Sequence, residues 1–163
     1  MERHDGVTTV NGDDERIQIL EGFYAAEMRY VALGGPRGGA TFDEMAAYFH
    51  PTAVMRQGPS TPFPGDWSGI DGVERFFRVL SDTWSAAEGL DLQYYTGARG
   101  VAVSMHVTLT SRATGRSVDA HLAQFVSFAD GLIADFAVQY LDPVAVSAVC
   151  YPNAVGVVSP RTR

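Results

Sequence analysis

Hydrophobic residues recur at helical spacing in the first part of the chain. A first helix is predicted to begin at a cap supplied by Asp13 or Asp14 and to end before the Gly-Gly-Pro breaker at 34–36. Its apolar positions follow helical spacing and are Ile17, Leu20, Tyr24, Tyr30 and Val31.

A short second helix is predicted from the cap Thr41 to Phe49, and a first strand is predicted at 53–57. The segment TPFPGDW at 61–67 is predicted to be a loop, and Asp71 is predicted to cap a third helix. The apolar stripe of this third helix consists of Val73, Phe76, Phe77 and Leu80.

After the third helix the period of the pattern changes from helical to two. Runs at roughly 90–110, 117–128 and 132–141 alternate or are rich in β-branched residues, and the turn signals ATGR and ADG separate them. Helices followed by an antiparallel meander predict an α+β domain in which a curved sheet wraps around helices packed on one face.

The chain has 163 residues, which suits one domain. Residues 1–14 are polar and are expected to form a disordered tail. The folded domain is predicted at 15–142. Residues 143–163 are rich in valine but interrupted by proline and glycine, and they are expected to run extended as a C-terminal tail.

Alternation sorts each strand into two faces, because successive side chains point to opposite sides. On the 101–110 strand the set that contains Met105 is apolar and is predicted to point inward. On the following strand the inward set is predicted to contain Leu122 and Gln124, and on the last strand it is predicted to contain Tyr140.

The inward side is predicted to hold an apolar cavity with few polar groups, which suits a small, hydrophobic, oxygenated molecule. An ordinary filled core is the alternative. Two inward amides, Gln57 and Gln124, favour the cavity, because an unpaired amide inside a core is costly unless a ligand or water satisfies it. The residues predicted to contact the ligand are Tyr24, Met55, Phe63, Asp66, Trp67, Met105, Leu122, Phe136, Val138 and Tyr140.

The rings of the 61–67 loop can be interpreted in two ways. Phe63 and Trp67 either plug the end of a core or form the rim of the cavity, and we expect the rim. Asp66 beside them and Asp142 after the last strand are candidate acids, because an apolar setting would raise the pKa of either carboxyl. A local turn for Asp66 and a capping role for Asp142 are the alternatives.

A turn centred near Thr114 would bring His106 and His121 together across a hairpin, with Asp119 on the same side. These groups resemble an acid-base cluster, but they lie on the polar face of the predicted sheet. We expect solvated or interface groups rather than catalysts. A register slip of one residue would reverse this assignment.

Composition and charge exclude several classes of function. The formal net charge of −7 opposes binding to nucleic-acid phosphates and anionic lipids. Cys150 is the single cysteine, so an intrachain disulfide is excluded and a cytoplasmic location is expected. No run approaches the roughly 18 apolar residues of a membrane helix. The histidines lack metal-ligand spacing, so we expect no metal. The sequence has no glycine motif of the nucleotide-binding kinds, and we expect no cofactor.

Three segments carry a resemblance to a known family: YFHPTAV at 48–54, PFPGDWSGIDGVERFF at 62–77 and FADGLIADFAVQYLD at 128–142. They resemble the nuclear-transport-factor-two-like superfamily, and in particular its SnoaL-like, polyketide cyclase-like domains. The resemblance implies a cone-shaped mixed sheet around three N-terminal helices. It also implies a homodimer formed through the outer sheet face, which carries His106, Asp119, His121 and Phe125.

The resemblance also implies which positions do chemistry. Gln57 stands where isomerase-like members carry a carboxylate base, and Gln124 stands where SnoaL-like cyclases carry an aspartate. An amide cannot act as a general base, but it can orient a carbonyl or a hydroxyl. Tyr30 is similar to the tyrosine on the first helix of the isomerases, with Tyr24 as an alternative.

Two hypotheses follow. The first is a cofactor-independent cyclase or isomerase of secondary metabolism, with Gln57, Gln124, Tyr30 and Asp142 as the catalytic candidates. The second is a non-catalytic ligand-binding or dimerisation module of the same fold, which the missing carboxylates favour.

Overall fold

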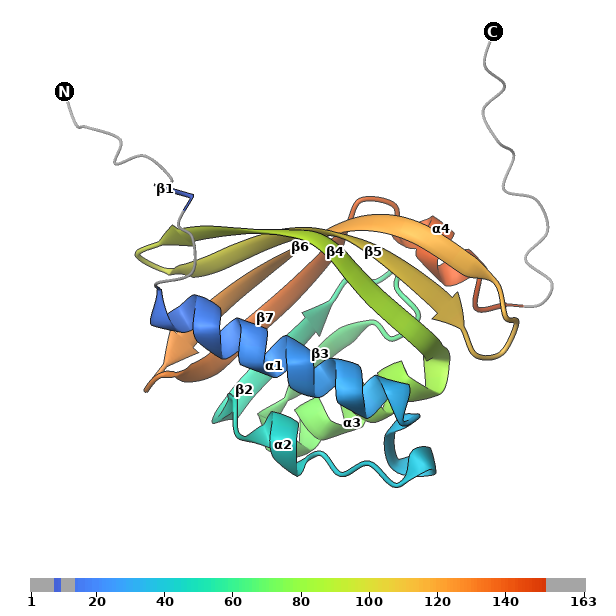
Figure 1. Cartoon of the computed structure of the whole chain (residues 1–163), viewed down its shortest axis with the longest axis horizontal. Coiled ribbons are helices and arrows are strands. Elements are labelled where there is room, and N and C mark those ends of the chain that lie inside the picture. The colour runs from blue at the N-terminus through green and yellow to red at the C-terminus, as the bar shows by residue number, and fades with distance from the viewer. Residues whose placement is uncertain (1–7, 10–13, 152–163) are drawn as a thin grey trace, which may run out of the picture.

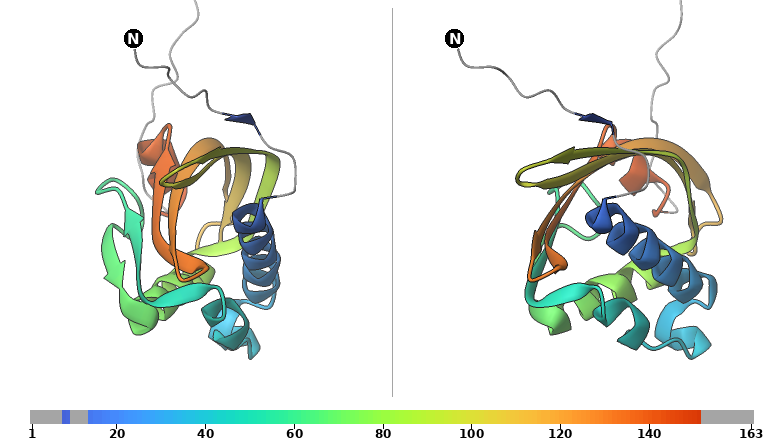
Figure 2. Two further views of the ribbon diagram at one scale, coloured as in Figure 1. Left: turned by 90° about the vertical axis from the view of Figure 1, so that its left-hand side faces the viewer. Right: turned by 60° about the vertical axis from the view of Figure 1, so that its left-hand side comes forward.

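The computed structural model describes residues 8–9 and 14–151, and within them a seven-stranded sheet curves over the helices (Figures 1 and 2). The strand order is β1-β4-β5-β6-β7-β2-β3. Neighbouring strands are antiparallel except β2 and β7, which are parallel, so the sheet is mixed. The predicted α+β fold with a curved sheet is confirmed.

Helix α1 spans Glu15–Ala32 and lies across the concave face of the sheet (Figure 1). Asp14 caps its start, since the side chain accepts a hydrogen bond from the Arg16 backbone amide. The helix ends before Gly34, whose left-handed φ of 82° suits a residue without a Cβ. The 3-10 turn η1, Gly35–Gly38, follows.

The second predicted helix is shorter than expected. Helix α2 covers only Asp43–Ala46, and Phe42 rather than Thr41 precedes it. Strand β2 already begins at Phe49 and runs as Phe49–Gln57. Phe49 leaves the helix because it pairs with Ile133 of β7 and packs edge-on against Phe23 at 5.2 Å between ring centroids.

Helix α3, Gly69–Thr83, starts two residues before its predicted cap. Its N-cap residue is Ser68, and Asp71 lies in the first turn. The end of the expected loop is strand β3, Gly65–Ser68, because its backbone pairs with residues 54–57 of β2. Pairing with a distant strand is not visible in the local pattern.

The meander consists of β4 (Trp84–Gly97), β5 (Gly100–Ser111), β6 (Ser117–Ala129) and β7 (Leu132–Tyr140). Strand β1, Thr8–Thr9, pairs with β4, and the rest of the expected tail at 1–14 lies outside the described residues except Asp14. The C-terminal segment begins with helix α4, Pro143–Ala148, where an extended run was expected. Residues 152–163 lie outside the described part of the chain.

The predicted strand faces are confirmed along β5 and most of β6. Met105, Leu122 and Gln124 are buried on the concave side. On β7 the inward set is correct from Phe136 onward, but at the start of the strand the buried residue is Ile133. The register of β7 against β6 shifts between Ile133 and Asp135, and this shift exchanges the two faces of β7.

The hairpin between β5 and β6 has the predicted register. His106 pairs with His121, and their rings stack with centroids 4.7 Å apart. Asp119 accepts a hydrogen bond from the Thr108 hydroxyl at 2.7 Å. All four side chains belong to the outward set, opposite the buried one.

Phe23 is the point at which α1, the sheet and α3 meet. Its ring contacts Phe49 of β2, Phe77 of α3 and Phe136 of β7, with centroids 5.2 to 5.7 Å apart. The side chain is 1% exposed. Edge-to-face packing of this kind adds to the free energy gained by burying the ring.

Replacing Phe23 by alanine is therefore expected to lower the free energy of unfolding by about 3–5 kcal/mol, because it removes a ring from a closed aromatic cluster. Urea denaturation measures the loss. The matched control is Leu33→Ala at the exposed end of the same helix, which should change stability by less than about 0.5 kcal/mol. Equal effects of the two substitutions would contradict the role given to Phe23.

Candidate functional site

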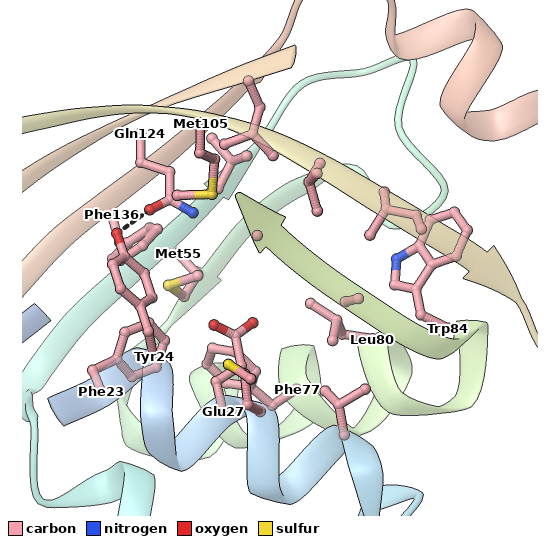
Figure 3. Close-up of a pocket in the computed structure, with 18 of the residues that line it drawn as sticks. Phe23, Tyr24, Glu27, Met55, Phe77, Leu80, Trp84, Met105, Gln124 and Phe136 are labelled. Atoms are coloured by element: carbon pink, nitrogen blue, oxygen red, sulfur yellow. Dashed lines mark hydrogen bonds between the residues drawn. The ribbon is translucent and has the colours of Figure 1, made fainter. Parts of the chain in front are cut away.

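A pocket lies between α1, α3 and the concave face of the sheet (Figure 3). Its volume is about 210 Å³, and its surface is mostly apolar. Nine of the residues predicted to contact a ligand or catalyse line it: Tyr24, Met55, Gln57, Met105, Leu122, Gln124, Phe136, Val138 and Tyr140. Alternation along the strands found all of them except Tyr24, which lies on α1, because the sheet has one concave side.

The rings of the 61–67 loop do not line this pocket. Phe63 and Trp67 pack against Phe76 of α3 at centroid distances of 5.4 and 6.0 Å, and Phe76 itself faces the pocket. The Trp67 indole N–H donates to the Phe63 carbonyl at 3.3 Å. The two rings therefore pack against Phe76 outside the pocket, and the expected position at the rim is wrong.

The two candidate acids also lie elsewhere. Asp66 is exposed and forms an ion pair with Arg56, which also binds Asp135 at 2.8 Å. Asp142 is exposed and caps α4, since its Oδ1 accepts from the Ala145 backbone amide at 3.0 Å. Neither carboxyl faces the pocket.

Tyr30 is buried but points away from the pocket. It packs in the seam between α1, η1 and α3, next to Gly35 and Ser81. Its hydroxyl is buried there without a well-formed hydrogen bond to Ser81. The tyrosine of α1 that reaches the pocket is Tyr24, the alternative weighed above.

Glu27 is the charged residue of the pocket lining, and it was not among the site residues predicted from the sequence. It lies one turn after Phe23 on α1, and its carboxylate points from the helix into the pocket toward Met55 (Figure 3). The side chain stays partly accessible because it faces the cavity. Among the described residues, the carboxylate has no ion-pair or hydrogen-bond partner. Burial among apolar groups raises the pKa of Glu27 from 4.5 to about 7.

The signal for Glu27 was present in the helical pattern. Residues 20, 24, 27 and 31 share one face of a helix, and three of them are the apolar positions used to predict α1. Such a stripe faces the interior of the protein, and a glutamate is rarely buried there without a partner. This placement therefore makes Glu27 a candidate for a functional residue once the helix is known to face a cavity.

Two tyrosines share the pocket with Glu27. Burial raises the pKa of the Tyr140 phenol, and the negative charge of Glu27 raises it further. Burial raises the pKa of Tyr24 well above its usual range, and Glu27 again adds to the shift. Both hydroxyls therefore keep their protons at neutral pH and act as hydrogen-bond donors.

The two amide side chains that the sheet contributes to the pocket differ in their hydrogen bonds. The Tyr24 hydroxyl donates to Gln124 Oε1, which fixes both side chains (Figure 3). Gln57 is 7% exposed, and its Oε1 is buried without a hydrogen-bond partner. An unsatisfied buried acceptor costs about 1–3 kcal/mol.

Trp84 is the tryptophan that lines the pocket, at the start of β4. It is 1% exposed, and Arg112 holds its backbone by donating to the Trp84 carbonyl at 3.1 Å. No periodic pattern identifies Trp84, because it lies at the junction between a helix and a strand.

Within residues 8–9 and 14–151, no three His, Cys, Asp or Glu side chains come together as a metal site. No helix in the same part of the chain is long and apolar enough to cross a membrane.

The sequence model of the SnoaL-like domain family matches residues 29–136, about two thirds of the chain. The chain belongs to the SnoaL-like domain family. The resemblance that the three segments carry is thereby confirmed.

Solved structures of similar fold agree with this assignment. An NTF2-like protein from Burkholderia xenovorans LB400 has a TM-score of 0.69 at 16% identity, covering 90% of this chain and 100% of that one. A putative SnoaL-like polyketide cyclase from Jannaschia sp. CCS1 has a TM-score of 0.64 at 14% identity, covering 88% and 99%. TerC, co-crystallised with polyporic acid, has a TM-score of 0.64 at 11% identity, covering 78% and 92%. No curated protein sequence gives a significant match.

This SnoaL-like domain thus departs from the pattern that the resemblance implies. The two positions expected to carry carboxylates, Gln57 and Gln124, line the pocket as amides. The pocket's carboxylate comes instead from α1, at Glu27. Among the described residues that line the pocket, no side chain is cationic.

Replacing Glu27 by glutamine is expected to stabilise the protein at neutral pH. Between about pH 4.5 and 7 the folded protein keeps the proton that the unfolded chain releases, so stability falls as pH rises through this window. The Glu27→Gln variant lacks this loss. Its free energy of unfolding should exceed that of the wild type by on the order of 1–3 kcal/mol at about pH 8, with no such excess below about pH 4.

Urea denaturation at both pH values measures the difference. The matched control is Glu21→Gln, which removes an exposed carboxylate from the same helix and should leave the pH dependence unchanged. An excess of the same size at both pH values would show that Glu27 has an ordinary pKa.

Proposed function

We propose that this SnoaL-like domain is a cofactor-independent enzyme of the cyclase or isomerase type, which moves a proton on a small, apolar, oxygenated molecule. The observation that carries the proposal is the Glu27 carboxylate inside a pocket that is otherwise lined by apolar side chains, tyrosines and amides. Glu27 is the general base and acid, a role the two amides cannot fill.

The environment of Glu27 suits this role. A general base works best when its pKa lies near the working pH, and burial brings the pKa of Glu27 to about 7. An apolar setting also removes water from the carboxylate and so strengthens it as a base. The absence of cationic side chains among the described lining residues favours an uncharged substrate over an anion.

Tyr140 supplies the second chemical group. Its hydroxyl lines the pocket and has no protein partner among the described residues. It stays protonated because burial and the charge of Glu27 raise its pKa. When Glu27 removes a proton next to a carbonyl, the Tyr140 hydroxyl donates to the oxygen on which negative charge develops. Tyr24 is occupied by Gln124 and orients that amide instead.

The comparisons support a ligand in the pocket. TerC shares this fold and was co-crystallised with polyporic acid, and the Jannaschia neighbour is described as a putative polyketide cyclase. Secondary metabolism is accordingly the proposed setting, and the single cysteine favours a cytoplasmic location.

A non-catalytic ligand-binding module is the second candidate. The presence of amides at both positions where the resemblance implies carboxylates favours it. The two candidates differ in one respect: catalysis requires a titrating Glu27, whereas binding does not.

The neutral aromatic probe 5-nitrobenzisoxazole separates them. Removal of its ring C–H proton by a base breaks the N–O bond and releases a coloured cyano-nitrophenolate, which absorbance follows. The protein is expected to open the probe with saturation kinetics, at a rate that rises with pH through an apparent pKa near 7. Glu27→Gln should lower the rate by about 100-fold or more, because general bases contribute factors of this size.

Glu21→Gln is the matched control and should keep the full rate, because this carboxylate is exposed on the same helix. If Glu27→Gln binds the probe and opens it as fast as the wild type, Glu27 is not the base. The non-catalytic module is then the better description.

We also propose that two copies pair through the outer face of the sheet. Phe125 on this face is 53% exposed, and the stacked pair His106 and His121 lies four residues away along the same strands. Large exposed aromatic side chains are enriched at protein interfaces.

Sedimentation equilibrium is expected to give a dimer for the wild type and a monomer for Phe125→Glu, because the variant places a charge in the centre of the interface. Leu33→Glu, at the exposed residue that follows α1, is the control that should remain dimeric. A wild-type monomer at every concentration would exclude this assembly.

A further inference from the structure

Gln57 and Gln124 occupy equivalent positions on the concave face. Each is paired in the sheet with Val138, Gln57 from the parallel strand β2 and Gln124 from the antiparallel strand β6. The two amides therefore flank one residue in a single row across the sheet, about two strand spacings apart, or roughly 10 Å.

The two amides differ in what satisfies them. Gln124 Oε1 accepts a hydrogen bond from Tyr24, so its acceptor is used within the protein. Gln57 Oε1 is buried, lines the pocket and has no partner. The residues paired with Gln57 on the two neighbouring strands are Gly65 and Val138. Neither has a side chain that can donate a hydrogen bond to Oε1.

We propose that Gln57 Oε1 is the specificity-determining acceptor of the pocket and that it accepts a hydrogen bond from a hydroxyl group of the ligand. The inference rests on the proposed function, since it requires the pocket to bind a small molecule. It narrows the ligand class to uncharged hydroxylated molecules, such as phenols, enols and alcohols. Ethers, hydrocarbons and those ketones that carry no hydroxyl group lack the required donor.

The selectivity arises because only one kind of ligand donates a hydrogen bond to the buried Gln57 acceptor. A hydroxylated ligand gives the buried acceptor its missing partner, whereas an isostere without a donor leaves that acceptor unpaired after binding. Gln57 is therefore a positioning residue for the chemistry assigned to Glu27, because it fixes one end of the ligand in the sheet while the carboxylate projects from the helix.

Phenol and toluene test the inference, because they have nearly the same shape and only phenol donates a hydrogen bond. Dissociation constants come from titrations of the amide resonances in proton–nitrogen NMR spectra. The ratio of the toluene constant to the phenol constant is expected to fall about tenfold in Gln57→Met, which keeps the size of the side chain and removes the acceptor. Gln139→Met, the same exchange at an exposed position on β7, should leave the ratio unchanged.

The outcomes separate this inference from the proposed function. If phenol and toluene both bind and Gln57→Met leaves their ratio unchanged, the inference is wrong while the pocket remains a ligand site. If anisole, which only accepts, binds better than phenol and loses this advantage in Gln57→Met, the amide presents its N–H₂ and the inference is also wrong. If no probe binds at all, both proposals fail.

The variant must fold for the comparison to count, and its melting temperature provides an independent check. Gln57→Met should melt at or above the wild-type temperature without ligand, because it removes a buried acceptor that has no partner. A marked decrease would mean that Gln57 Oε1 is satisfied within the protein, and this result would overturn the inference.

Discussion

The structure depends on the packing of Phe23 between the first helix, the curved sheet and α3. One ring contacts phenylalanines from three other elements, so α1 is held in one orientation across the concave face. Residues four positions apart lie on the same side of a helix, one turn from each other. The aromatic cluster that anchors Phe23 therefore also directs Glu27 into the pocket.

The pocket combines this carboxylate with groups that do not neutralise it. The described lining offers no cation to Glu27, and the other polar side chains of the pocket are two phenols, two amides and the Trp84 indole. The protein accordingly tolerates a carboxyl group whose pKa is far from its ordinary value, at a cost in stability that grows with pH. A group that destabilises the fold in this way is typical of a site kept for chemistry rather than for packing.

Much of this arrangement could be predicted from the sequence, because some of its rules are local. Alternation identified the concave residues of β5 and β6, and the short turn fixed the pairing of His106 with His121. The positions of Phe63 and Trp67 could not be predicted in this way. They depend on β3 pairing with β2 and on contacts with Phe76, which the local pattern does not contain.

Glu27 was missed for a different reason. The first helix was predicted from its apolar positions alone. A charged residue among them did not contribute to that prediction. Its importance follows only when the stripe is seen to face a cavity rather than a filled core. The same observation bears on the departure of Gln57 and Gln124 from the carboxylates that the resemblance implies, because the pocket still contains a carboxylate, which projects from the helix instead of the sheet.

The most direct test of this account is a carbon-13 NMR titration of the Glu27 side-chain carboxyl, with the resonance assigned by its loss in Glu27→Gln. A transition near pH 7 is expected, because the carboxyl is buried among apolar groups. A transition near the ordinary value of 4.5 would show that the carboxylate is well solvated, and it would contradict the central claim.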